Sequence, residues 1–275
     1  MLEEPFDVPV KDGALHGHRA GKGRPAILLH GGAAVPDYLG PCADLLDGLF
    51  ETIRYTQRGT PPSHAPPPYT IEEHVRDALT VLDHFGLERA WAIGHSWGGH
   101  LALHVLTGHP ERIEGVLCID PLGADPSVFA SFDRRLDETL TEEERTRVRE
   151  IEERRRGGDV TEAELVERFR LVWPVYFTRS PSPPPERVGV QASIETNRSL
   201  AEHFERRTLA GKLPSVTAPV LFVHGEDDPV PPASSTGTAA LIPGARVETI
   251  PDCGHFPWLE QPAGFRTAVE CLLSE

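Results

Sequence analysis

The 275-residue sequence contains few cysteines and no long apolar run. Its four cysteines, Cys42, Cys118, Cys253 and Cys271, form no C-x-x-C pair and have no metal-ligand spacing. We therefore expect free thiols, no metal site and no cofactor. No apolar run approaches the ~20 residues that cross a bilayer, and the first residues, MLEEP, are acidic where a secretory signal would be basic. These absences predict a soluble, cytoplasmic protein.

Positive charge is also scarce, because 27 basic residues stand against 42 acidic ones and the formal net charge is −15. A surface of this sign repels phosphate backbones and anionic lipids. We therefore expect neither nucleic acid nor a membrane as a partner. The length fits one large domain, or a core domain that carries an insertion.

Strand and helix signals alternate through the first third of the chain. Buried or alternating apolar runs predict strands at 6–10, 14–18, 25–30, 52–55, 90–93 and 113–119. A capping box that begins at Thr70 predicts a helix that runs to Gly86. Strand signals return at 218–224 and 247–250, and a last helix is expected at 262–273. This order predicts an α/β fold with a mostly parallel, doubly wound sheet.

Residues 125–213 have a different character. Their helical segments are rich in Arg and Glu, with capping boxes at Thr141 and Thr161, and we expect these helices to be mainly solvated. A dense aromatic cluster at 169–177 interrupts them and must face something apolar. We interpret 125–213 as a helical lid inserted after the sixth strand, and 1–124 with 214–275 as the core domain.

A serine stands at a tight turn between a predicted strand and a predicted helix. Gly94 and Gly98 flank Ser96 at two positions on either side, where the two backbones pass too closely for a larger residue. The free N–H groups at the start of the helix favour developing negative charge. Ser96 is therefore the candidate nucleophile, and the N–H of Trp97 is a candidate donor to an oxyanion.

A serine nucleophile needs a base, and the base needs an anion that orients it. The strand at 218–224 runs into Asp227 and Asp228, and the strand at 247–250 runs into His255. Parallel strands place these ends at the edge of the sheet where Ser96 also lies. His255 is the candidate base, with Asp228 as its acid and Asp227 as the alternative. We expect structural roles for His30, His95, His100, His104 and His224.

Three separated motifs, GHSWGG at 94–99, GEDDPVPP at 225–232 and GHFPWLEQP at 254–262, together resemble the α/β-hydrolase superfamily. The resemblance covers the chain from end to end. It implies the α/β-hydrolase fold, a catalytic triad of Ser96, Asp228 and His255, and a covalent acyl-enzyme. It favours Asp228 over Asp227 and assigns the second oxyanion donor to the N–H of Gly32.

Within the superfamily, HGG at 30–32, QRG at 57–59 and the tryptophan after Ser96 resemble the proline iminopeptidase-like branch. The chain departs from that branch beside the site, with HGGAA in place of HGGPG and TQRGTPPS in place of DQRGxGxS. The resemblance makes Glu195 a candidate anchor for a substrate amino group. The lid aromatics Trp173, Tyr176 and Phe177 are candidate substrate contacts.

Three functions remain open from the sequence. The broadest is a serine hydrolase that cleaves an ester, lactone or amide bond of a small molecule. The second is an iminopeptidase-type aminopeptidase acting on a short peptide. The third, from another class, is a ligand-binding homologue without turnover, because a fold can be retained when catalysis is lost.

Overall fold

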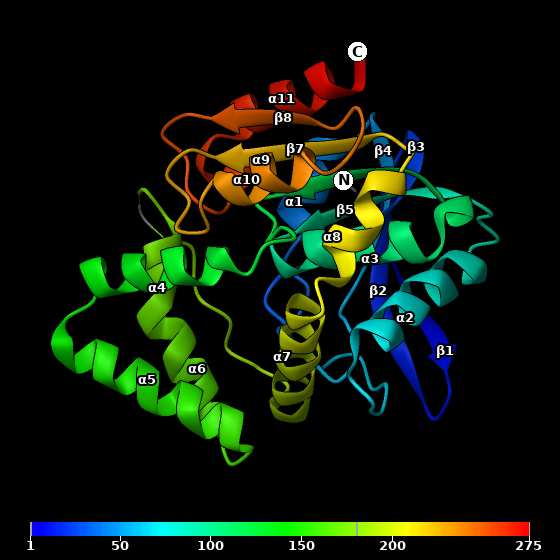
Figure 1. Ribbon diagram of the computed structural model, residues 1–275. Helices are drawn as coiled ribbons and strands as arrows, with labels where there is room; N and C mark the ends of the chain where they lie inside the picture. Colours follow the sequence, from blue (N-terminus) through cyan, green and yellow to red (C-terminus); the bar gives the residue numbers. More distant parts are fainter. Residues whose placement is uncertain (1, 180, 275) are drawn as a thin grey trace.

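The computed structural model describes residues 2–179 and 181–274. Within them lies one eight-stranded sheet with the strand order β1-β2-β4-β3-β5-β6-β7-β8 (Figure 1). The strands are β1 (Glu3–Val10), β2 (Gly13–Gly21), β3 (Arg24–Leu29), β4 (Phe50–Tyr55), β5 (Ala90–His95), β6 (Ile113–Ile119), β7 (Val220–Gly225) and β8 (Arg246–Ile250). β2 pairs antiparallel with β1 and β4, and all other neighbours are parallel. The predicted mostly parallel sheet is confirmed.

Helices cover both faces of this sheet, because its central strands are apolar on both sides. In β3, Ile27 and Leu29 join one buried cluster while Ala26 and Leu28 join the other. The first cluster packs beneath α2 (Ile71–His84) and α3 (Trp97–Gly108). The second packs beneath α1 (Gly40–Leu46), α10 (Pro257–Glu260) and α11 (Pro262–Ser274). A further short helix, α9 (Ala233–Ala239), lies between β7 and β8.

The segment between β6 and β7 is helical. It contains α4 (Ser127–Thr139), α5 (Glu142–Gly157), α6 (Glu162–Val172), η2 (Trp173–Tyr176), α7 (Val190–Glu205) and α8 (Thr208–Lys212). The capping boxes at Thr141 and Thr161 are formed, and each threonine side chain accepts the N–H of a glutamate three residues on. Gly158 ends α5 in the left-handed conformation that glycine favours.

The inserted helices fall into two groups. In Figure 1, α4, α5 and α6 lie together on the side toward which the arrowheads of β7 and β8 point. By contrast, α7 and α8 contribute Leu200, Phe204 and Leu209 to the cluster that also contains residues of α2 and α3. The division at 125 and 213 stays a prediction. Among the described residues, no helix combines the length and the apolar character that a membrane span requires.

Candidate active site

Ser96 occupies the turn between β5 and α3 in a backbone conformation that non-glycine residues rarely adopt. Its φ is 55° and its ψ is −119°. A Cβ at position 94 would lie 2.1 Å from the carbonyl oxygen of Gly98, and a Cβ at position 98 would lie 1.9 Å from that of Leu29. Both glycines are therefore required. Within 91–100 Ser96 alone is half-buried, and its neighbours are buried.

An acid–base pair is formed by two loops at the ends of β7 and β8. His255 Nδ1 donates to Asp228 Oδ2 at 2.7 Å, and the other carboxylate oxygen accepts the N–H of Val230 at 2.8 Å. Burial alone would raise the pKa of Asp228, but the imidazoles of His255 and His224 outweigh it and hold that pKa well below its ordinary value. Asp227 is exposed. Of the two alternatives, Asp228 is thus the carboxylate bonded to His255.

A chain of hydrogen bonds joins the loops around Ser96 and His255. The Gly31 N–H donates to Tyr38 Oη at 2.9 Å, and this hydroxyl lies 2.6 Å from His95 Nδ1. His95 Nε2 donates to the carbonyl of His255 at 2.8 Å. Burial, and then the nearby His255, keep the pKa of His95 well below its ordinary value, so the ring stays neutral. The residue preceding Ser96 thereby fixes the loop that carries the candidate base.

Ser96 Oγ and the His255 ring form no hydrogen bond among the described residues, so their direct contact stays a prediction. The loops that carry them are nonetheless adjacent, since the His95 and His255 ring centroids are 4.6 Å apart. Catalytic hydrogen bonds are often long without substrate and shorten in its complex.

The two candidate oxyanion donors, Gly32 and Trp97, line the same cavity as Ser96. Trp97 is the first residue of α3, so its N–H has no acceptor within the helix. Gly32 has a φ of 57°, a value that residues with a side chain rarely adopt. Their assignment as donors stays a prediction.

Gln57 holds the two loops that carry these N–H groups together. Its amide N–H donates to His30 Nε2 at 2.9 Å, and its side-chain nitrogen donates to the His30 carbonyl at 2.7 Å. Its side-chain oxygen accepts the indole N–H of Trp97 at 2.8 Å. Both ring nitrogens of His30 are bonded, because Nδ1 donates to the Gly31 carbonyl at 2.9 Å. His30 therefore has the structural role that we expected.

The predicted aromatic contacts lie in two environments. Tyr176 lines the cavity, stacks on His255 at a centroid distance of 4.8 Å, and accepts the His255 N–H through its carbonyl at 2.8 Å. Trp173 and Phe177 are not among the cavity-lining residues. They pack instead on Phe256, at 5.0 and 4.8 Å between ring centroids. Of the three predicted aromatics Tyr176 lines the cavity and the other two support the loop of His255, so the substrate contact of Tyr176 stays a prediction.

Glu195 lies on α7, outside the residues that line the cavity. Its carboxylate accepts the N–H of Tyr69 at 3.1 Å and the side-chain amide of Gln191 at 2.6 Å. The bond to Tyr69 ties α7 to the loop before α2, whereas the bond to Gln191 lies within α7. Both oxygens of the Glu195 carboxylate therefore accept hydrogen bonds from the protein itself.

The cavity has a volume of about 600 Å³ and extends from Ser96 to α4, α5 and α6. The sequence interpretation missed one group of its lining residues, namely Arg145, Arg149, Arg155, Arg156 and Arg168. The expectation that the Arg- and Glu-rich helices are mainly solvated holds at Arg149 and Arg156, which are exposed, whereas Arg145, Arg155 and Arg168 are half-buried against the cavity. The charge pattern shows which residues share a helix, but it does not show which side of that helix faces a cavity.

A second missed residue, Asp120, follows β6 and is fully buried beside Asp228. Its Oδ1 accepts the N–H of Gly225 at 2.7 Å. Burial, and then the negative charge of Asp228, raise the pKa of Asp120 well above its ordinary value. Asp120, His224 and Asp228 are close enough to suggest a metal site. Both nitrogens of His224 are already bonded, to Ser235 Oγ and the Val230 carbonyl at 2.7 Å each, which leaves no free nitrogen for a metal.

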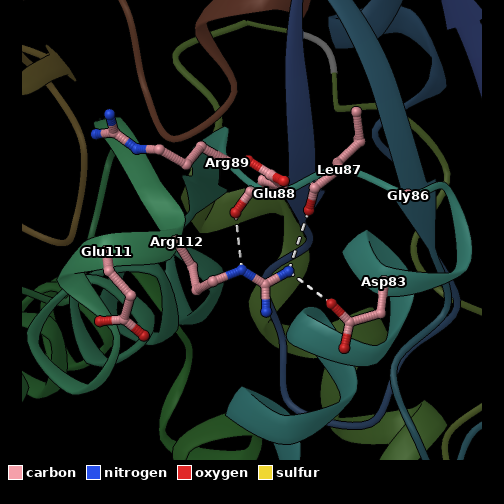
Figure 2. A pocket seen from close by; sticks show the side chains of 7 residues that line it. All are labelled: Asp83, Gly86, Leu87, Glu88, Arg89, Glu111 and Arg112. Carbon is pink, nitrogen blue, oxygen red and sulfur yellow. Dashed lines mark hydrogen bonds and ion pairs between the residues drawn. The ribbon is translucent and has the colours of Figure 1, made fainter.

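Figure 2 shows another hollow, between the end of α2 and the start of β5. Its central side chain, Arg112, donates to Asp83 at 2.6 Å and to the carbonyls of Glu88 and Leu87 at 2.8 and 3.1 Å. The lining contains no serine, cysteine or histidine. This hollow lies at the amino ends of β5 and β6, whereas Ser96 lies at the carboxyl end of β5. Arg112 has a structural role there.

Comparison with known proteins agrees with this geometry. A family model described as the alpha/beta hydrolase fold matches residues 25–262. The chain is 28% identical to a 2-hydroxymuconate semialdehyde hydrolase of Pseudomonas putida, over 94% of this chain and 90% of that protein. It is 25% identical to a proline iminopeptidase of Lactobacillus crispatus, over 86% and 85% of the two chains.

Solved structures share the fold. A proline iminopeptidase-related protein from Thermus thermophilus superposes with a TM-score of 0.70 at 22% identity, covering 100% of this chain and 98% of the other. An enol-lactonase from Burkholderia xenovorans superposes with a TM-score of 0.67 at 24% identity, covering 98% and 100%. These likenesses confirm the predicted fold.

Proposed function

Since the chain belongs to the alpha/beta hydrolase family, we propose that it is a serine hydrolase that cleaves an ester, lactone or amide bond of a small molecule. Ser96 is the nucleophile, His255 the general base, and Asp228 the acid that orients His255. One observation carries the proposal. Ser96 stands in a strained conformation on the cavity wall, beside a loop whose histidine is already bonded through Nδ1 to a buried carboxylate.

The reaction follows from the roles of these groups. Because Nδ1 of His255 is held by Asp228, Nε2 is the nitrogen that can take the proton from Ser96 Oγ. The serine oxygen adds to the substrate carbonyl, and the protonated imidazole then gives its proton to the leaving alcohol or amine. An acyl-enzyme remains. Water, activated by the same nitrogen, releases the acid and restores Ser96.

The negative oxygen formed on addition needs donors that are already aimed. We assign the N–H of Trp97 and the N–H of Gly32 to this role. Loss of one such donor typically costs about 3 kcal/mol of transition-state stabilisation. The Gln57 bonds to His30 and Trp97 support this assignment, because they restrict the relative movement of the two loops.

A small ester or lactone is favoured over a peptide. An aminopeptidase needs an acidic group that captures the substrate amino terminus, and the candidate Glu195 is bonded to Tyr69 and Gln191 outside the cavity. No observation specifically favours the peptidase. The relatives named above include hydrolases of both kinds, so the choice depends on experiment.

A hydrolysis panel tests the proposal. We expect purified protein to hydrolyse p-nitrophenyl esters of short acids and to leave prolyl and alanyl arylamides intact. Ser96→Ala should abolish turnover, whereas Ser127→Ala, which removes a hydroxyl from the start of α4, should retain it. Arylamide cleavage that depends on Glu195 would replace the ester proposal with the peptidase. No turnover of any member would favour the ligand-binding homologue.

A further inference from the structure

The cavity beside Ser96 has more positive than negative side chains in its lining, although the protein as a whole is acidic. The chain as a whole has a formal net charge of −15. The cavity lining, however, includes five arginines and only three acids, Asp133, Asp137 and Glu152. All eight charged residues lie on α4, α5 or α6, whereas the lining from the core domain is uncharged. The inserted helices therefore place positive charge over a candidate site in an acidic protein.

Two of these arginines are neutralised by neighbours. Arg149 donates to Asp137 at 2.8 Å. Arg145 donates to Glu142 at 2.7 Å and to the carbonyl of Leu140 at 2.9 Å. Of the other charged lining residues, Asp133 and Arg156 are exposed, so water screens their opposite charges. These residues give no excess of either sign.

The excess comes from Arg155 and Arg168, which share the single carboxylate of Glu152. Arg155 Nε donates to Glu152 Oε2 at 2.9 Å, and Arg168 Nε forms an ion pair with Glu152 Oε1. The three side chains are only 17%, 19% and 21% exposed, so their charges are poorly hydrated. Among the described residues no other acceptor bonds to Arg168. Among the described residues Glu152 is thus the carboxylate that bonds to both guanidiniums, while the exposed Asp133 is an electrostatic neighbour of Arg168 without an ion pair to it, and several N–H donors remain available.

This group lies close to the proposed reacting centre. The positive charge of Arg168 opposes the pKa increase that burial imposes on Tyr176, so the two side chains are electrostatic neighbours. Tyr176 in turn stacks on His255 at 4.8 Å between ring centroids. Apart from its charged residues, the cavity lining is largely apolar and includes Leu122, Val128, Phe132, Leu136 and Leu200. A short hydrocarbon chain is compatible with this apolar lining.

We propose that Arg168, supported by Arg155, binds a free carboxylate of the substrate. The substrate class is then a small ester or lactone whose acyl part ends in a carboxylate, such as the half-ester of a dicarboxylic acid. This inference rests on the proposed serine hydrolase function. Guanidinium groups bind carboxylates through two parallel hydrogen bonds, and the unused donors supply that geometry. A cationic substrate group is disfavoured, because Glu152 already contacts two arginines.

Two esters of equal chain length test this specificity. The mono-p-nitrophenyl ester of glutaric acid carries a terminal carboxylate, and p-nitrophenyl pentanoate ends in a methyl group. We expect the wild-type ratio of kcat/KM, glutarate over pentanoate, to exceed one. Arg168→Met should lower this ratio about tenfold, and Arg168→Lys should restore part of it. Glu152→Gln, which removes the competing carboxylate, should raise it.

Arg170→Met is the matched control, since it removes the same charge from an exposed position of α6 outside the cavity. We expect the ratio of this variant to match that of the wild type. A ratio that Arg168→Met leaves unchanged, or that Arg170→Met lowers equally, would overturn the inference while ester hydrolysis itself stands. If the wild type hydrolyses neither ester, the proposed function fails instead. Because the ratio is internal to each variant, partial loss of folded protein does not affect it.

Discussion

At the residue scale, the chemistry of the candidate site depends on which carboxylate faces His255. Asp228 is buried and bonded to His255 Nδ1 at 2.7 Å, while its neighbour Asp227 is exposed. Asp228→Asn should lower the rate at which a fluorophosphonate labels Ser96 by about 1,000-fold or more, because His255 then loses the anion that stabilises its charged form. Asp227→Asn should stay within about twofold of the wild-type rate. Equal effects of the two substitutions would show that another acid orients His255.

The sequence was informative about these residues for a local reason. Ser96 directly follows β5, and Asp228 and His255 lie in the loops that follow β7 and β8, so the parallel strands bring all three to the same end of the sheet. Asp120 also follows a strand, but it lies in none of the three motifs, so nothing marked it as a neighbour of Asp228. The arginines of the cavity were missed because their contacts depend on how α4, α5 and α6 pack, which the charge pattern leaves open.

At the element scale, the tight passage between β3 and α3 determines where Ser96 lies. A Cβ on Gly98 would come within 1.9 Å of the Leu29 carbonyl oxygen, whereas a Cβ on Gly108, in the same helix, meets nothing within 4 Å. Gly98→Ala should therefore lower the free energy of unfolding by several kcal/mol, and Gly108→Ala should raise it by up to about 1 kcal/mol. Urea unfolding measures both. A Gly98→Ala protein as stable as the wild type would contradict the observed packing.

The range of the contacts that fix each helix or strand explains which of them could be predicted from the sequence. Capping boxes at Thr141 and Thr161 were visible because their hydrogen bonds span only three residues. Each predicted strand end lies within three residues of its observed position, because continuous or alternating apolar runs mark the strands. The association of α7 and α8 with the core was not visible, because it depends on contacts of Leu200, Phe204 and Leu209 with helices about 100 residues away in the chain.

At the scale of the whole molecule, buried neutral histidines make stability depend on pH. Burial lowers the pKa of His74 to about 3 and that of His100 to about 4. Below pH 6.5 these histidines bind protons in the unfolded chain but stay neutral in the folded chain. The free energy of unfolding therefore falls as the pH falls. At pH 5.5 each such histidine costs about 1.4 kcal/mol relative to pH 7.5.

Urea unfolding of the wild type and of His74→Gln at these two pH values measures the effect. Glutamine keeps a donor for Thr196 Oγ1, which lies 3.0 Å from His74 Nε2, but it does not titrate. The pH dependence should be smaller by about 1.4 kcal/mol in the variant. An identical dependence in both proteins would mean that His74 is not kept neutral by burial.

The proposed hydrolase activity requires that Ser96 is a nucleophile activated by its surroundings. The most direct measurement is intact-protein mass spectrometry after reaction with a fluorophosphonate, followed by mapping of the modified peptide. We expect one adduct per chain, located on Ser96, and no adduct on Ser96→Ala. An unmodified wild-type protein, or equal labelling of the Ser96→Ala variant, would contradict it.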